Sequence, residues 1–211
     1  MNIDLPYLII VILVILVSMT LHEAMHAYAS YWLGDDTAKL SGRLTLNPIK
    51  HIDPFMTLLL PILLAIAGAP VFGGAKPVPF NPNNLKFEEW GVAIVAIAGP
   101  LVNFILAFLS IGLWVIVGSP VGGFAQQLLI TIASVNLGFF VFNLIPIPPL
   151  DGSRVLYALA PDFVRRIMEA MEKFGIMIVF AILLIAGTAL ETYMANAINF
   201  LLNVFGRFWG L

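Results

Sequence analysis

The chain has 211 residues, of which 61% are hydrophobic and only 10% are charged, whereas soluble domains carry about a quarter charged residues. This composition indicates a membrane protein. The net charge of −2 provides no basic surface for nucleic acid, which excludes that class of partner. The absence of cysteine excludes disulfides, thiolate nucleophiles and cysteine zinc clusters, so any metal must be bound by nitrogen and oxygen atoms.

Long segments without charge predict an all-α polytopic membrane protein with about four or five transmembrane helices, a re-entrant segment and short extended loops. A bilayer core of about 30 Å needs roughly 20 apolar residues for each helical crossing. We expect a single membrane-embedded domain over residues 1–211, with helices at about 5–33, 88–117, 124–145, 174–190 and 194–209. The last of these is short and could instead lie in the membrane interface.

The apolar segment 54–72 decides the topology, because it can either cross the membrane or enter and return. If it returns, nine of the ten lysines and arginines share one side of the membrane, and the uncharged turn at 118–123 lies on the other. The positive-inside rule favours this arrangement, and the prolines and glycines of the segment suit broken backbone buried in protein. We therefore predict a re-entrant segment, an external N-terminus, and cytoplasmic loops at 34–88 and 146–173.

The first predicted helix carries three ionisable residues, His22, Glu23 and His26, in the pattern H-E-x-x-H. This spacing places both imidazoles on one helix face, where they can bind one zinc ion while the glutamate acts on a bound water. An ionised Asp, Lys or Arg at a helix centre costs about 2.5–3.5 kcal/mol on insertion scales, so such a cluster needs a shared purpose. The alternative is a buried polar cluster that fixes helix packing. His22 lies about 25 Å beyond Leu5 along the helix, nearer the cytoplasmic end.

A catalytic zinc ion takes three protein ligands and leaves a position for water, so a third ligand must come from elsewhere in the chain. Asp151 follows the proline-rich end of an apolar helix, at the predicted start of the next helix, and is the best candidate by location. Its alternative role is to cap that helix. His51 and Asp53 fall in a polar loop, where surface or turn roles are favoured, and Glu191 would face the outside.

These motifs resemble the site-2 protease family of intramembrane zinc metalloproteases, because H-E-x-x-H comes first and both Asn143 and Leu150-Asp151-Gly152 follow far downstream. The segments 41–48 (SGRLTLNP), 75–79 (AKPVP) and 98–103 (AGPLVN) resemble the small bacterial and archaeal members. Between the predicted helices, we find no stretch long enough for the PDZ or CBS domain that many relatives carry.

The resemblance implies a zinc-dependent endopeptidase of the plasma membrane, which cleaves peptide bonds in or near the transmembrane helices of other membrane proteins. His22, His26 and Asp151 would bind one Zn²⁺ ion, Glu23 would move the proton of the attacking water, and Asn143 would help to position the substrate or the reaction oxygen. The implied partners are a substrate helix and the lipid bilayer, while the oligomeric state stays open.

The alternative function is a membrane transporter in which the same histidines, glutamate and aspartate form a proton or metal relay. A relay needs ionisable groups at successive depths. The long apolar segment 90–150 offers only amides and hydroxyls, such as those of Asn103 and Asn136, which could equally be hydrogen bonds between packed helices.

Overall fold

The computed structural model describes residues 5–60, 63 and 74–210, and within them it contains helices and no β-strand. Four helices are long and apolar enough to cross a membrane: α1 (Leu5–Trp32), α4 (Glu88–Ile116), α5 (Gly123–Asn143) and α8 (Gly175–Trp209). The first three agree with the predicted helices to within two residues at each end. The predicted class, an all-α polytopic membrane protein, is confirmed.

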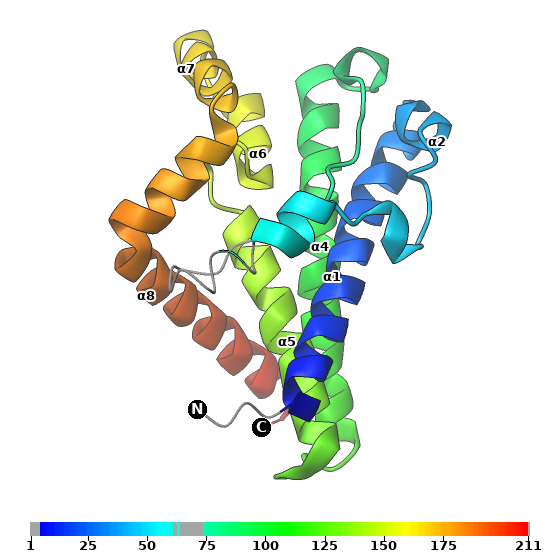
Figure 1. The fold of residues 1–211 in the computed structure, drawn as a ribbon, viewed down its shortest axis with the longest axis vertical. Coiled ribbons are helices and arrows are strands. Elements are labelled where there is room, and N and C mark those ends of the chain that lie inside the picture. The colour runs from blue at the N-terminus through cyan, green and yellow to red at the C-terminus, as the bar shows by residue number, and fades with distance from the viewer. Residues whose placement is uncertain (1–4, 61–62, 64–73, 211) are drawn as a thin grey trace.

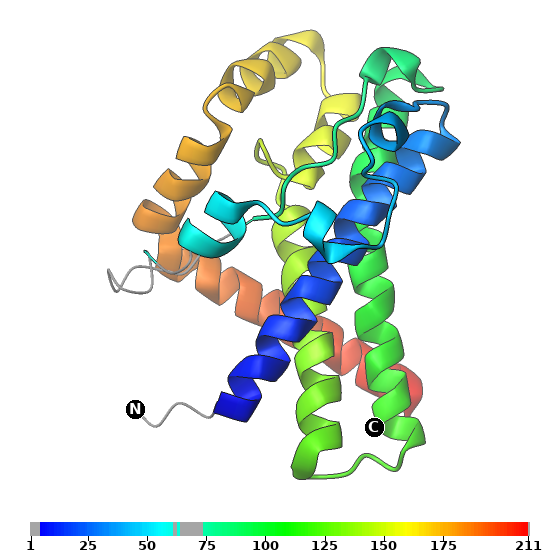
Figure 2. The ribbon, with the colours of Figure 1, turned by 45° about the vertical axis from the view of Figure 1, so that its right-hand side comes forward.

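The shorter elements include two helices, α6 and α7, in the segment 146–173, which the sequence predicts mainly as a loop. Figures 1 and 2 show α2, α6 and α7 at one end of the long helices, whereas the first turn of α1 and the last turn of α8 lie toward the other. The shorter elements are α2 (Thr37–Leu40), η1 (Pro48–Lys50), the π-helix η2 (Pro54–Leu59), η3 (Pro82–Asn84), α6 (Asp151–Leu159) and α7 (Asp162–Glu172).

Helix α4 is the central element, because it contacts α1, α5, α6 and α8. Most of its buried residues are glycine, alanine or serine. Lipid tails are as apolar as leucine, so membrane helices associate through close packing of small residues and through hydrogen bonds rather than through the hydrophobic effect. The small residues of α4 therefore let α1 and α5 approach it closely, and this approach builds the polar centre described below.

The C-terminal part of the chain differs from the prediction of separate helices at 174–190 and 194–209. It is one helix, α8, with a kink at Ala186, where φ is −117° and ψ is 18°. The polar residues Glu191 and Thr192 do not break it, because the Thr192 hydroxyl donates back to the Thr188 carbonyl at 2.8 Å. At about 52 Å, its 35 residues exceed a bilayer core, and the kink redirects the second half toward α4 (Figure 2). There the indole of Trp209 donates to the Phe108 carbonyl at 3.2 Å.

The two ends of the segment that connects α1 to α4 lie next to each other, at the C-terminal end of α1. The backbone N–H of Lys86 donates to the Leu33 carbonyl at 2.9 Å. The fully buried Asp35 carboxylate holds the same junction, because it accepts hydrogen bonds from Thr37, Asn81 and Asn84. Most of the predicted re-entrant segment 54–72 lies outside the described residues, apart from η2, Leu60 and Leu63.

Candidate metal centre

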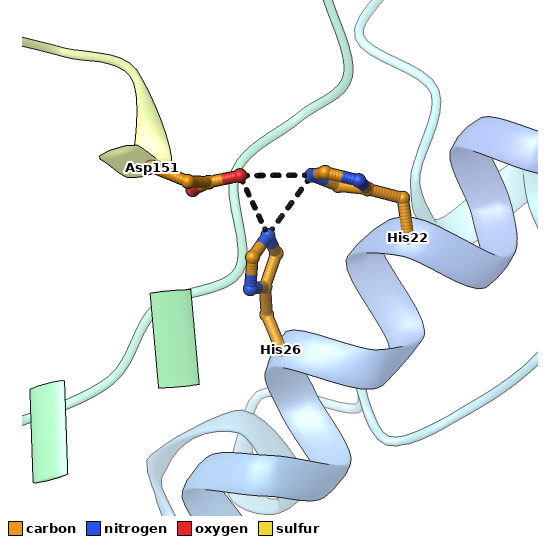
Figure 3. Close-up of side chains that lie close together, drawn as sticks. All are labelled: His22, His26 and Asp151. Carbon is orange, nitrogen blue, oxygen red and sulfur yellow. Dashed lines mark hydrogen bonds and ion pairs between the residues drawn. The ribbon is translucent and has the colours of Figure 1, made fainter. Parts of the chain in front are cut away.

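His22, His26 and Asp151 meet at one point, although nearly 130 residues separate the histidines from the aspartate (Figure 3). The two histidine Nε2 atoms are 3.0 Å apart, and Oδ2 of Asp151 lies 3.1 Å from Nε2 of His22 and 3.4 Å from Nε2 of His26. Both histidines are buried. In the part of the chain that the structure describes, this is the one group of three such side chains arranged to hold a metal ion.

The hydrogen bonds behind the two imidazoles fix where their protons are. Nδ1 of His26 lies 2.8 Å from the Val95 carbonyl, and Nδ1 of His22 lies 2.6 Å from Oδ1 of Asn103. Both partners are acceptors, so each Nδ1 is the donor, and in the neutral ring the Nε2 atom then carries a lone pair. Two imidazole lone pairs and a carboxylate oxygen thus converge, an arrangement that a cation stabilises.

The spacing and environment of these atoms fit zinc. In a tetrahedral site with Zn–N distances of 2.0–2.1 Å, ligand atoms are about 3.3 Å apart, close to the three separations observed. Oδ2 of Asp151 is buried and has no hydrogen-bond partner. Burial alone would raise the pKa of the Asp151 carboxyl, but the facing imidazoles outweigh it and hold that pKa below its ordinary value. The ionised carboxylate is the form that binds a metal ion.

The turn between α5 and α6 places Asp151 beside the two histidines. Asp151 is the first residue of α6 and the N-cap position is occupied by Leu150, so Asp151 does not take the N-cap position of its alternative role. The next residue must be glycine, because a Cβ at position 152 would collide with the carbonyl group of Leu144, at the end of α5. The Leu-Asp-Gly sequence thus combines a candidate metal ligand with the residue that permits the close approach of its helix to α5.

One face of α4 completes the centre, and the sequence alone did not reveal this role. Val95, Gly99 and Asn103 recur every four residues and face the two histidines. A Cβ at Gly99 would lie 2.5 Å from Nε2 of His26 and 2.7 Å from Nε2 of His22, so only glycine leaves the space in front of both ligand atoms open.

Asn103 also belongs to a buried network that ties three helices together. Its Nδ2 donates to Oδ1 of Asn136 at 2.8 Å, and Nδ2 of Asn136 donates to the Ser18 hydroxyl at 2.9 Å. Both asparagines are fully buried. Asn103 had been considered for helix packing. The network confirms that role and adds contact with a metal-ligand candidate, for which the A-G-P-L-V-N segment was the available signal.

The substitution Asn103→Ala is expected to weaken zinc binding by about 10- to 100-fold, because outer partners orient ligating imidazoles. Isothermal titration of the zinc-free protein with Zn²⁺ measures this change. Asn203→Ala, at an exposed position of α8, is the matched control and should bind zinc like the wild type. Equal affinity of the two variants would contradict the assigned role of Asn103.

The structure places the other two predicted catalytic residues as follows. Glu23 is half-buried on α1 beside the ligands and interacts electrostatically with the buried guanidinium of Arg43, whose pKa burial lowers and Glu23 raises. Nδ2 of Asn143 donates to the Phe139 carbonyl one turn earlier in α5, at 3.0 Å. No hydrogen bond joins Asn143 to His22, His26 or Asp151, and its role stays a prediction.

The remaining ligand candidates have local roles. Asp53 accepts hydrogen bonds from the backbone of Phe55 and Met56, which is the predicted turn role. His51 is not a surface residue, because it is fully buried and its Nε2 lies 2.9 Å from the Thr45 carbonyl. Glu191 is exposed on α8, away from the metal group.

An apolar cavity of about 410 Å³ lies between the end of α5 and the kink of α8. Leu150, which immediately precedes Asp151, forms part of its wall. The other side is formed by α8 residues on both sides of the kink, including Leu183, Ala186 and Leu190. Its lining suits apolar side chains.

Comparison with known proteins identifies similar sequences. Peptidase family M50 matches this chain over residues 117–186. YwhC of Bacillus subtilis (strain 168), which carries a zinc metalloprotease name, is 42% identical over 200 residues, covering 90% of this chain and 84% of YwhC. Rip2 of Mycolicibacterium smegmatis, with a name of the same kind, is 32% identical over 184 residues, covering 85% and 70%. Zinc metalloprotease MJ0392 of Methanocaldococcus jannaschii is 30% identical over 150 residues, covering 71% and 34%. No solved structure matches the chain.

Proposed function

The chain belongs to peptidase family M50, the site-2 protease family, and from this we propose that it hydrolyses peptide bonds in or beside the transmembrane helices of other membrane proteins. It is a multi-pass membrane protein and a zinc metalloprotease. The observation that carries the proposal is the convergence of His22, His26 and Asp151 within a bundle of apolar helices. A peptidase centre built there meets substrates that are themselves in the membrane.

In the proposed mechanism, His22, His26 and Asp151 would hold the zinc ion. When bound, zinc acidifies a water molecule and polarises the scissile carbonyl. Glu23 lies between the two histidines in sequence and accepts the proton of the attacking water, then returns it to the leaving nitrogen. Asn103 holds the His22 ring in the orientation that hydrolysis requires.

The substrate must present an unwound peptide bond, because the carbonyl groups of an intact helix are occupied by intrahelical hydrogen bonds. The apolar cavity beside Leu150 supports a hydrophobic substrate, since it can accept side chains that flank the scissile bond. We therefore expect helix-breaking residues near the cleavage site of good substrates.

The proposed function is tested with purified protein and a membrane-helix substrate in detergent, with and without a chelator. Chelation is expected to abolish cleavage, and stoichiometric Zn²⁺ to restore it. Asp151→Asn should lose both the bound zinc, measured by elemental analysis, and the cleavage, because a neutral amide replaces the anionic ligand. Asp36→Asn, at an exposed carboxylate outside the centre, is the control and should keep both. Cleavage that survives zinc removal would refute the proposal.

We also propose that the end of the molecule carrying α2, α6 and α7 is cytoplasmic, which places the N-terminus outside and the active site nearer the cytoplasm. The hydrogen bond between Leu33 and Lys86 supports this topology, because it returns the intervening segment to the side where α1 ends. Nine lysines and arginines then share the cytoplasmic side.

Reporter fusions at residues 80 and 120 test this orientation. A cytoplasmic reporter should be active at residue 80 and inactive at residue 120, and an external reporter should give the reverse pattern, because α4 crosses between the two positions. If both fusions report the same side, the topology is wrong.

The transporter alternative does not explain the chain equally well. Family membership assigns a peptidase, and among the described residues the groups that extend from the centre into the bundle are the neutral Asn103, Asn136 and Ser18. Neutral amides and a hydroxyl can orient a ligand, whereas a relay depends on ionisable groups at successive depths.

A further inference from the structure

Helix α7 (Asp162–Glu172) faces the protein on one side only. On that side Met168 is buried, Glu169 accepts a hydrogen bond from the Tyr157 hydroxyl at 2.6 Å, and Glu172 pairs with Arg154. Arg165 extends to Glu89 at the start of α4, at 3.5 Å. These contacts fix the rotation of α7 about its own axis.

The opposite side of α7 presents large apolar side chains that nothing in the described chain covers. Phe163, Ile167 and Phe174, just beyond the helix, are 65%, 56% and 59% exposed. With 11 residues, α7 is too short to cross a bilayer. It leads directly into the membrane-spanning α8, whose first turns also expose apolar residues, Ile176 and Met177 among them. The exposed face is therefore continuous with a lipid-facing surface, as expected of a helix lying in the membrane interface.

A shallow and widely open groove of about 500 Å³ lies on this face where α7 meets α8, and we call it the elbow groove. Figure 2 shows that α7 continues into α8 and that α7 lies toward the end of the molecule where α6 lies. The groove residues are Arg166, Ile167, Ala170, Met171, Phe174 and Ile178. One end thus carries a cation, and the other end continues down the apolar surface of α8.

The cation at the elbow groove, Arg166, differs from the nearby arginines Arg154 and Arg165 in having no carboxylate partner. Arg154 and Arg165 both form ion pairs. Arg166 makes one long hydrogen bond, from Nε to the Asp162 carbonyl at 3.5 Å, and no carboxylate among the described residues lies within ion-pairing distance of it. An exposed guanidinium beside an apolar groove binds phosphate well, because it offers several donors in a planar fork.

We propose that the elbow groove binds an anionic phospholipid of the surrounding bilayer, with its phosphate group on Arg166 and an acyl chain along Phe174 and Ile178. The order of groups in the groove matches the order of groups in such a lipid, from charged head to apolar tail. The lipid would cover the apolar face of α7 and hold α7 at the membrane surface. This position matters for the enzyme, since α6, which carries Asp151, packs against α7 through Tyr157 and Arg154.

The experiment titrates the purified, delipidated full chain in detergent with phosphatidylglycerol or with zwitterionic phosphatidylcholine, and counts bound lipid by native mass spectrometry. The wild type should bind phosphatidylglycerol more tightly. Arg166→Gln should weaken that binding about fivefold and leave phosphatidylcholine binding unchanged, since one cation is lost near an anionic headgroup. The control Lys50→Gln removes an exposed cation of η1 and should bind both lipids like the wild type.

Three outcomes would overturn the proposal. They are equal wild-type affinity for the two lipids, an equal loss of binding in Arg166→Gln and Lys50→Gln, and displacement of the lipid by millimolar inorganic phosphate, which would indicate a phosphate site without a lipid role. Zinc content should be unchanged in Arg166→Gln, which separates lipid binding from the integrity of the metal centre.

Discussion

Replacing Glu23 with glutamine is expected to slow substrate cleavage by about 10²- to 10⁴-fold while one zinc ion per chain is retained. Glutamine keeps the size of the side chain but cannot accept the proton of the attacking water. The Glu23 side chain contributes no ligand atom to the His22–His26–Asp151 group, so metal binding should not depend on Glu23. Single-turnover cleavage of a membrane-helix substrate, with elemental analysis of the same sample, measures both quantities.

The matched control is Glu191→Gln, which makes the same chemical change at an exposed position of α8. Its cleavage rate and zinc content should equal those of the wild type. A Glu23→Gln enzyme that cleaves at the wild-type rate would exclude Glu23 as the proton acceptor, whereas loss of zinc from it would mean that Glu23 supports the metal centre instead.

Adding a single methyl group at Gly99 is expected to abolish both zinc binding and cleavage. In Gly99→Ala the new Cβ would lie 2.5 Å from Nε2 of His26 and 2.7 Å from Nε2 of His22, far closer than atoms can pack. To remove this steric clash, α1 and α4 would have to separate or the imidazoles would have to turn away. Either movement breaks the hydrogen bonds to Val95 and Asn103. Zinc titration of the purified variant measures the loss.

Gly138→Ala provides the comparison, because this glycine lies in α5 and a Cβ there would meet open space. Alanine is the better helix former, so this variant should be folded and should bind zinc normally. A Gly99→Ala protein that binds zinc as tightly as Gly138→Ala would show that the histidines do not present their Nε2 atoms toward α4.

The sequence predicted the crossing helices well where charge is absent and turns are marked. The boundaries of α1, α4 and α5 follow from long apolar segments and from the Gly118–Gly123 turn. The end of the chain was harder, because hydropathy does not distinguish two helices from one kinked helix. At Glu191 and Thr192 the polarity suggested an end, yet a threonine hydroxyl can bond to its own helix, and the bend instead falls beside Gly187.

For the candidate site, local spacing was informative and tertiary packing was not accessible. The positions of His22 and His26 on one helix face follow from the helical repeat, and Asp151 followed from its place after a helix end. In contrast, Asn103 lies in an apolar segment where an amide serves equally well for packing or for orienting a ligand. Its contact with His22 depends on how closely α1 approaches α4, which only the three-dimensional arrangement provides.

The order of the three ligand candidates along the chain has a consequence for biosynthesis. His22 and His26 belong to α1, the first of the four long apolar helices in the described part of the chain, whereas Asp151 follows α5, the third of them. During synthesis the histidine pair is therefore inserted long before its carboxylate partner exists, and two imidazoles alone do not form the three-ligand centre of a catalytic zinc site. On the proposed ligand set, the zinc centre is complete only after α5 has been synthesised and the chain has turned back to bring Asp151 to the histidines.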